Sequence, residues 1–88
     1  MTADSLRASI IDILAVISPD EDFENLKDSE PFRDQFSMDS MDMLDVVLEL
    51  RRRFSLSIPE ADYPNLVSME SSIKYLLPLL NEKEKANG

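Results

Sequence analysis

The chain has 88 residues, neither cysteine nor histidine, and a net charge of −9 from 18 acidic and 9 basic residues. These absences exclude disulfides, the usual zinc ligand sets and imidazole-based catalysis, so we expect no metal site, no catalytic residue and no enzymatic activity. The acidic surface disfavours nucleic acid as a partner and favours basic protein patches.

The first predicted helix covers residues 4–17. Its apolar side chains recur at steps of three and four, as on one face of a helix: Leu6, Ile10, Ile13, Leu14 and Ile17. Asp4 or Ser5 is available as the cap, and Pro19 closes the segment. This helix therefore offers a single apolar face to a core.

Residues 18–38 are long for a loop in so small a protein. The segment is rich in acids and has room for a helical turn. Four apolar side chains can pin it to the core: Phe23, Leu26, Phe32 and Phe36.

The second predicted helix, from Ser40 to about Phe54, carries three stripes of side chains at ~100° per residue. The broadest is apolar and is predicted to face the core: Met43, Val46, Val47, Leu50 and Phe54. A second apolar stripe lies nearly opposite and consists of Met41, Leu44 and Leu48. An acidic stripe lies between the two apolar ones and consists of Asp42, Asp45 and Glu49. Such a pair of stripes is typical of a docking surface, although the long loop could instead cover the second apolar stripe.

Two further elements complete the chain. Residues 58–64 have room for only a turn or two of helix between prolines. The last predicted helix runs from about Ser68, as a cap, to Leu80 and carries Ile73, Tyr75, Leu76 and Leu77. Pro78 is predicted to kink this helix or to end its regular part, and residues 82–88 are predicted to fray.

Together these elements predict an all-α fold, a four-helix bundle with a short third helix and a long first loop. We expect one domain over residues 1–88, with a core over about 4–80. No apolar run approaches the roughly 20 residues that a membrane span needs, and the N-terminus lacks the features of a secretory signal. We therefore expect a monomer in the cytoplasm, without stable membrane insertion.

A motif stands at the head of the second helix: Met38-Asp39-Ser40-Met41-Asp42. Its centre resembles the Asp-Ser-Leu motif of acyl carrier proteins, with methionine as a volume-conserving replacement for leucine. The match continues without a gap through two acids, a phenylalanine and an Ile-Pro pair: Asp42, Asp45, Phe54, Ile58 and Pro59. The sequence thus resembles the acyl carrier protein family over Asp39 to Pro59.

The resemblance implies that Ser40 accepts 4′-phosphopantetheine from coenzyme A and that acyl groups are carried on this arm as thioesters. Asp39 and Met41 would be the neighbours of the attachment site. The implied partners are a phosphopantetheinyl transferase and acyl-activating, synthase or acyltransferase enzymes with basic docking patches. The residues implied to contact them are Asp42, Leu44, Asp45, Leu48 and Glu49.

The physics of the site agrees with this resemblance. Ser40 is expected at the cap or first turn of a helix, where backbone N–H groups and the positive end of the dipole suit a phosphodiester. The alternative is that Ser40 only caps the helix. A hydrolase built on Ser40 lacks a histidine base and a glycine-rich oxyanion turn, and the spacing of the aspartates does not match a calcium-binding loop.

One departure from the family is the run Arg51-Arg52-Arg53, where many members continue the acidic series. We therefore expect a specialised carrier in fatty acid or other lipid metabolism rather than the housekeeping one. Four methionines are candidates for an adaptable cargo site: Met38, Met41, Met43 and Met69. Two other functions stay open, an aminoacyl or peptidyl carrier and an unmodified acidic interaction module.

Overall fold

The computed structural model describes residues 1–87, with side chains through Lys85. Its helices are α1 (Ala3–Ile17), α2 (Phe32–Gln35), α3 (Ser40–Phe54), the 3₁₀ helix η1 (Glu60–Leu66) and α4 (Met69–Asn87). Over these residues there is no strand, only an isolated bridge between Pro31 and Ser68. The predicted all-α fold is confirmed. Helix α2 is the helical turn for which the long loop had room.

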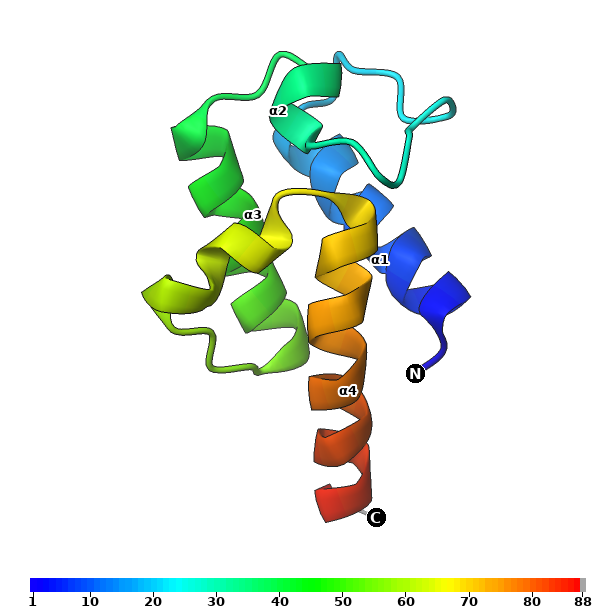
Figure 1. Ribbon diagram of the computed structural model, residues 1–88, viewed down its shortest axis with the longest axis vertical. Coiled ribbons are helices and arrows are strands. Elements are labelled where there is room, and N and C mark those ends of the chain that lie inside the picture. The colour runs from blue at the N-terminus through cyan, green and yellow to red at the C-terminus, as the bar shows by residue number, and fades with distance from the viewer. Residues whose placement is uncertain (88) are drawn as a thin grey trace.

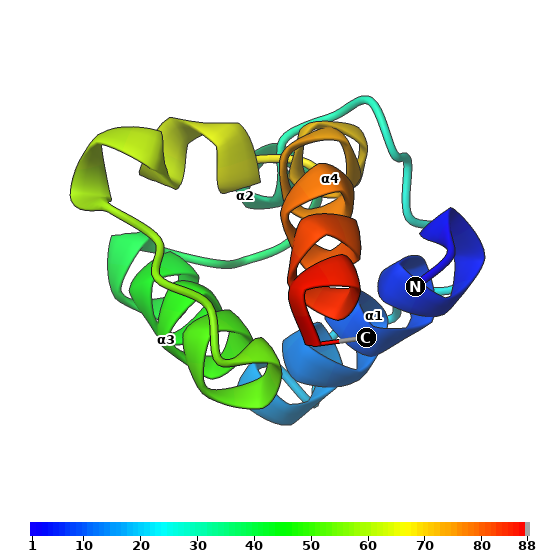
Figure 2. The ribbon, with the colours of Figure 1, turned by 90° about the horizontal axis from the view of Figure 1, so that it is seen from below.

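The three long helices and η1 enclose the core. Helix α1 contacts both α3 and α4, and η1 packs against α4. Figure 1 shows the long loop and α2 at one end of the molecule, with α4 extending toward the other end. Viewed along α4, η1 and α3 lie on one side of that helix, and α1 runs from the other side beneath it toward α3 (Figure 2). None of the described helices combines the length and the apolar character that a membrane crossing requires.

The core comes from the faces that the periodicity predicted, except at three positions of α1 and α3. Its members on the long helices are Leu6, Ile10, Ile13, Leu14, Val46, Val47, Leu50, Met69, Leu76 and Leu80. Ile17 in α1 and Met43 and Phe54 in α3 are only partly buried against this cluster. Full burial of one such aliphatic side chain contributes about 1.5–3 kcal/mol. The core faces of α1, α3 and α4, together with apolar side chains from the loops and η1, therefore stabilise the fold.

Helix α1 begins earlier than predicted, because its cap is Thr2. The Thr2 hydroxyl accepts the Ser5 N–H at 3.1 Å, and the Ser5 hydroxyl accepts the Thr2 N–H at 3.2 Å. The prediction of Asp4 or Ser5 as the cap was wrong. A reciprocal capping box needs two residues three positions apart, and Thr2 and Ser5 provide it.

The loop between α1 and α3 is pinned by its apolar residues, as predicted. Phe23, Leu26 and Phe32 are buried, and Phe36 packs edge-on against Phe23 with ring centroids 4.7 Å apart. Arg7 of α1 also donates hydrogen bonds to both carboxylate oxygens of Asp28, at 2.8–3.3 Å. The loop is therefore fixed to α1.

Helix α4 has the predicted cap but a different end. The Ser68 hydroxyl accepts the Ser71 N–H at 3.1 Å. The helix passes Pro78 and reaches Asn87, so of the two effects predicted for Pro78 an end of the helix is wrong. Residues 82–87, where fraying was predicted, are helical here, and Gly88 lies outside the described residues. Two long-range contacts hold the last turns: Lys83 Nζ donates to the Ser55 carbonyl at 3.2 Å, and the Met1 amino group donates to Glu84 at 2.8–2.9 Å.

Candidate functional site

The start of α3 is capped by Asp39, not by Ser40. The Asp39 carboxylate accepts the Asp42 N–H at 2.9 Å, and the Asp42 carboxylate accepts the Asp39 N–H at 3.2 Å. Ser40 is the first helical residue, and the capping box does not involve its hydroxyl. The interpretation of Ser40 as a plain cap is therefore wrong, because the cap is complete without it.

Ser40 is accessible to a modifying enzyme. Both Asp39 and Ser40 are exposed, and the next side chain, Met41, has 75% of its surface exposed. At this position the unsatisfied N–H groups of the first turn and the positive end of the helix dipole favour a negative charge. An exposed hydroxyl in this setting fits a phosphodiester-linked cofactor.

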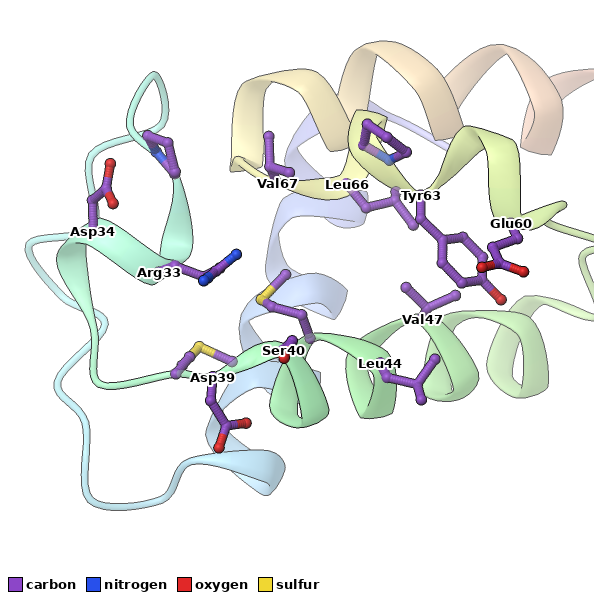
Figure 3. A pocket seen from close by; sticks show the side chains of 14 residues that line it. Arg33, Asp34, Asp39, Ser40, Leu44, Val47, Glu60, Tyr63, Leu66 and Val67 are labelled. Atoms are coloured by element: carbon purple, nitrogen blue, oxygen red, sulfur yellow. The ribbon is translucent and has the colours of Figure 1, made fainter.

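An open groove of about 860 Å³ lies beside Ser40, bounded by α2, the first half of α3 and η1. Figure 3 shows Ser40 and Arg33 toward one end of the groove and Tyr63 and Glu60 toward the other. The apolar part of its lining is Met38, Met43, Leu44, Val47, Tyr63, Pro64, Leu66 and Val67. The site thus combines an exposed serine hydroxyl with a continuous apolar surface that several side chains form.

Two of the four candidate methionines line this groove. Met38 and Met43 do so, whereas Met69 is fully buried in the core and Met41 is exposed on α3 outside the groove lining. The alternation of stripes on α3 explains the separation, because Met41 and Met43 lie on nearly opposite faces. Only Met38 and Met43 are therefore in a position to contact a ligand there.

The η1 wall of the groove is tied to α4 by one hydrogen bond. The Tyr75 hydroxyl of α4 donates to the Asp62 carboxylate of η1 at 2.7 Å. Burial and this hydrogen bond raise the pKa of Tyr75 to about 12, because both disfavour the phenolate. The bond holds η1 in place over α4.

The second apolar stripe of α3 is exposed. Leu44 and Leu48 have 46% and 48% of their surface exposed, and Met41 has more. The alternative in which the long loop covers this stripe is wrong, because the apolar residues of that loop are turned into the core. An exposed row of large apolar side chains thus runs along α3 from the Ser40 end.

The three acids predicted for docking differ in their local contacts. Asp42 belongs to the capping box, and Glu49 accepts hydrogen bonds from Arg52 at 2.7 and 2.8 Å. Asp45 is exposed and forms no ion pair within the described residues. The spacing of Glu49 and Arg52, three positions apart on one helix, is the signal that could have predicted their pairing.

Several groove residues were not predicted as site residues: Arg33, Glu60, Tyr63, Leu66 and Val67. They come from α2, η1 and the junction with α4, which the sequence did not place beside α3. The only sequence signal for the η1 wall was the proline-flanked segment 58–64. Its Tyr63 has an apolar ring and a polar hydroxyl, so it can line a groove.

A family model described as "Phosphopantetheine attachment site" matches residues 4–73, most of the chain. An acyl carrier protein from Chlamydia muridarum is 33% identical over 73 residues, covering 83% of this chain and 88% of that protein. The chain belongs to the acyl carrier protein family. A second acyl carrier protein, from Chloroherpeton thalassium, is 28% identical over 85 residues and is covered along its whole length, with 97% of this chain matched.

Acyl carrier proteins are carriers rather than enzymes, and their cofactor is 4′-phosphopantetheine. The residues around Ser40 fit this group. An exposed hydroxyl outside the capping box can form the ester, the first turn of α3 can accept the phosphate charge, and the groove offers apolar surface next to the attachment point.

Proposed function

We propose that the chain carries acyl groups as thioesters on a 4′-phosphopantetheine arm attached to the Ser40 oxygen. A phosphopantetheinyl transferase installs the arm from coenzyme A. The observation that carries this proposal is that Ser40 is exposed as the first residue of α3 while Asp39 supplies the cap. A hydroxyl that the fold does not use is available for modification.

The groove favours an acyl cargo over an aminoacyl cargo. Its lining is mainly apolar, including Met38, Val47 and Leu66. Each methylene that leaves water contributes about 0.8 kcal/mol, and an acyl chain has more methylenes to bury than a typical aminoacyl group. An acyl chain therefore gains more from this surface.

The exposed face of α3 is the proposed docking surface. It consists of Leu44, Leu48 and Asp45, extended by Met41 at the Ser40 end and by the capping residue Asp42 and the paired Glu49. Apolar contact provides affinity and Asp45 attracts a basic patch on the transferase or on an acyl-activating, synthase or acyltransferase enzyme.

The far end of the same helix is cationic, which supports a specialised carrier. Arg51 and Arg53 are exposed, while Arg52 pairs with Glu49. Cations in the last turn also stabilise the helix dipole, so the fold tolerates them. A partner must therefore present basic groups near Asp45 and avoid them near Arg51, which limits the set of enzymes that can dock.

Incubation with coenzyme A and a broad-specificity phosphopantetheinyl transferase tests the proposal. Intact-mass measurement should show the gain of one phosphopantetheinyl group, and peptide mapping should place it on Ser40. Ser40→Ala should abolish the gain, and Ser37→Ala, a change at a neighbouring exposed serine, should leave it intact. Absence of the group from the wild-type chain, or its presence on another residue, would overturn the proposal.

A further inference from the structure

Arg33 is the cationic member of the groove lining. Every other charged residue among the described groove residues is acidic: Asp34, Asp39 and Glu60. Figure 3 shows the Arg33 side chain pointing from α2 into the groove at the end where Ser40 lies. A single positive charge therefore lies beside the start of α3 in a chain whose net charge is −9.

The backbone that carries Arg33 is fixed from several sides. The neighbouring Phe32 is buried to 1% exposure, and its N–H donates to the Val67 carbonyl at 2.8 Å. The Gln35 side-chain amide donates to the carbonyls of Lys27 and Glu30 at 2.7 and 2.8 Å. Helix α2 has only one turn, so these contacts rather than its own hydrogen bonds fix the direction in which Arg33 leaves it.

Arg33 also has no anionic partner of its own. Among the described side chains, Arg7 pairs with Asp28 and Arg52 pairs with Glu49, whereas Arg33 forms no ion pair although Asp34 and Asp39 line the same groove. A guanidinium group binds two phosphate oxygens with two parallel hydrogen bonds. It therefore suits a phosphodiester better than a lysine ammonium group, which acts as a point charge.

We propose that Arg33 is the counter-ion of the phosphodiester that joins the arm to Ser40. This inference rests on the proposed function. The phosphate is the first group of the arm after the serine oxygen, so it stays at the Ser40 end of the groove, between the first turn of α3 and Arg33. The acyl group lies at the other end of the arm. Arg33 therefore binds the linkage whatever the cargo is, and directs the arm toward the groove.

Phosphorus NMR of the loaded chain without cargo tests this ion pair. The wild-type phosphodiester signal should move with added salt, because salt screens an exposed ion pair. In Arg33→Gln the signal should be displaced from the wild-type position, and its salt dependence should be lost. Arg53→Gln, which removes an equal charge at the far end of α3, should leave both properties as in the wild type.

A second measurement does not depend on folding of the variant. The Arg33 side-chain Nε–Hε signal of the wild-type chain should shift when the arm is added, before any acyl group is attached. The ion pair would be overturned if the Arg33 Nε–Hε signal did not shift on loading and the phosphorus signal of Arg33→Gln matched that of the wild type. The proposed function would then still stand. A wild-type chain that never gains the arm would overturn both.

Discussion

Tyr75 of α4 donates a hydrogen bond to Asp62 of η1 at 2.7 Å, and this contact connects the wall of the groove to the longest helix. The two residues are 13 positions apart, on either side of the turn at Ser68. Neither belongs to the groove lining, yet their bond ties η1, which supplies Glu60, Tyr63, Pro64 and Leu66 to that lining, to α4.

The first prediction concerns alkaline pH. The pKa of Tyr75 is about 12 in the folded chain, above its ordinary value of 10.0, so folding favours the protonated phenol. The stabilisation is complete below about pH 10 and declines as pH rises toward 12. Denaturant unfolding should show that the free energy of unfolding falls over this pH range. In Tyr75→Phe the part of this fall that is due to Tyr75 should be absent. An identical pH dependence in Tyr75→Phe would contradict the assignment.

The second prediction separates the cap from the attachment site. Asp39→Ala should lower the free energy of unfolding by about 1 kcal/mol, because it removes the acceptor of the Asp42 N–H. Ser40→Ala should change it by much less, since the capping box does not involve the hydroxyl. Urea unfolding of the unmodified variants measures both. A Ser40→Ala loss as large as the Asp39→Ala loss would mean that Ser40 is a structural cap.

The third prediction concerns the groove. Val67 lines it and is 43% exposed, so Val67→Trp should narrow it without disturbing the core. Each methylene of a bound acyl chain that is kept out removes about 0.8 kcal/mol of stabilisation. The gain in unfolding temperature on acylation should therefore shrink in this variant.

Val16→Trp is the matched control for this measurement. Val16 is 68% exposed on α1 and is not among the groove residues. The acylated Val16→Trp protein should keep the wild-type gain in unfolding temperature. An equal gain in all three proteins would show that the acyl chain does not enter the groove.

The fourth prediction concerns the arginines of α3. Arg51→Glu with Arg53→Glu should raise kcat/KM several-fold with carrier-dependent enzymes whose docking patches are basic throughout, because it removes repulsion at the far end of the helix. The readout is a panel of acyltransferases and synthases assayed with loaded protein. Unchanged preference across the panel would remove the case for a specialised carrier.

Periodicity predicted the long helices and most of their core faces, because burial of Ile10 or Leu50 is decided by position along one helix. It failed where distant residues meet. The part of α4 past Pro78 makes contacts with distant residues, such as that between Met1 and Glu84, 83 positions apart. No local rule reports such a contact.

The candidate site shows the same division. The motif drew attention to Ser40 and the periodicity predicted the exposed apolar stripe, since both follow from the register of α3. The groove was not predicted, because it forms only where η1 lies beside α3 and brings Tyr63 and Leu66 into the lining. The different contacts of Asp42 and Glu49 were also missed, because equal spacing on a helix does not show which acids the helix itself uses.

The reciprocal bonds between Asp39 and Asp42 leave the Ser40 hydroxyl out of the capping box, so an ester on Ser40 would break none of the hydrogen bonds that begin α3. If Ser40 carries the arm, loading would therefore require no rearrangement of the proposed docking surface. An enzyme that contacts only the surface of α3 would therefore bind the unloaded and the loaded protein equally well. Discrimination between them must come from the arm and its cargo, so unloaded protein is expected to act as a competitor for every docking site that the loaded form uses.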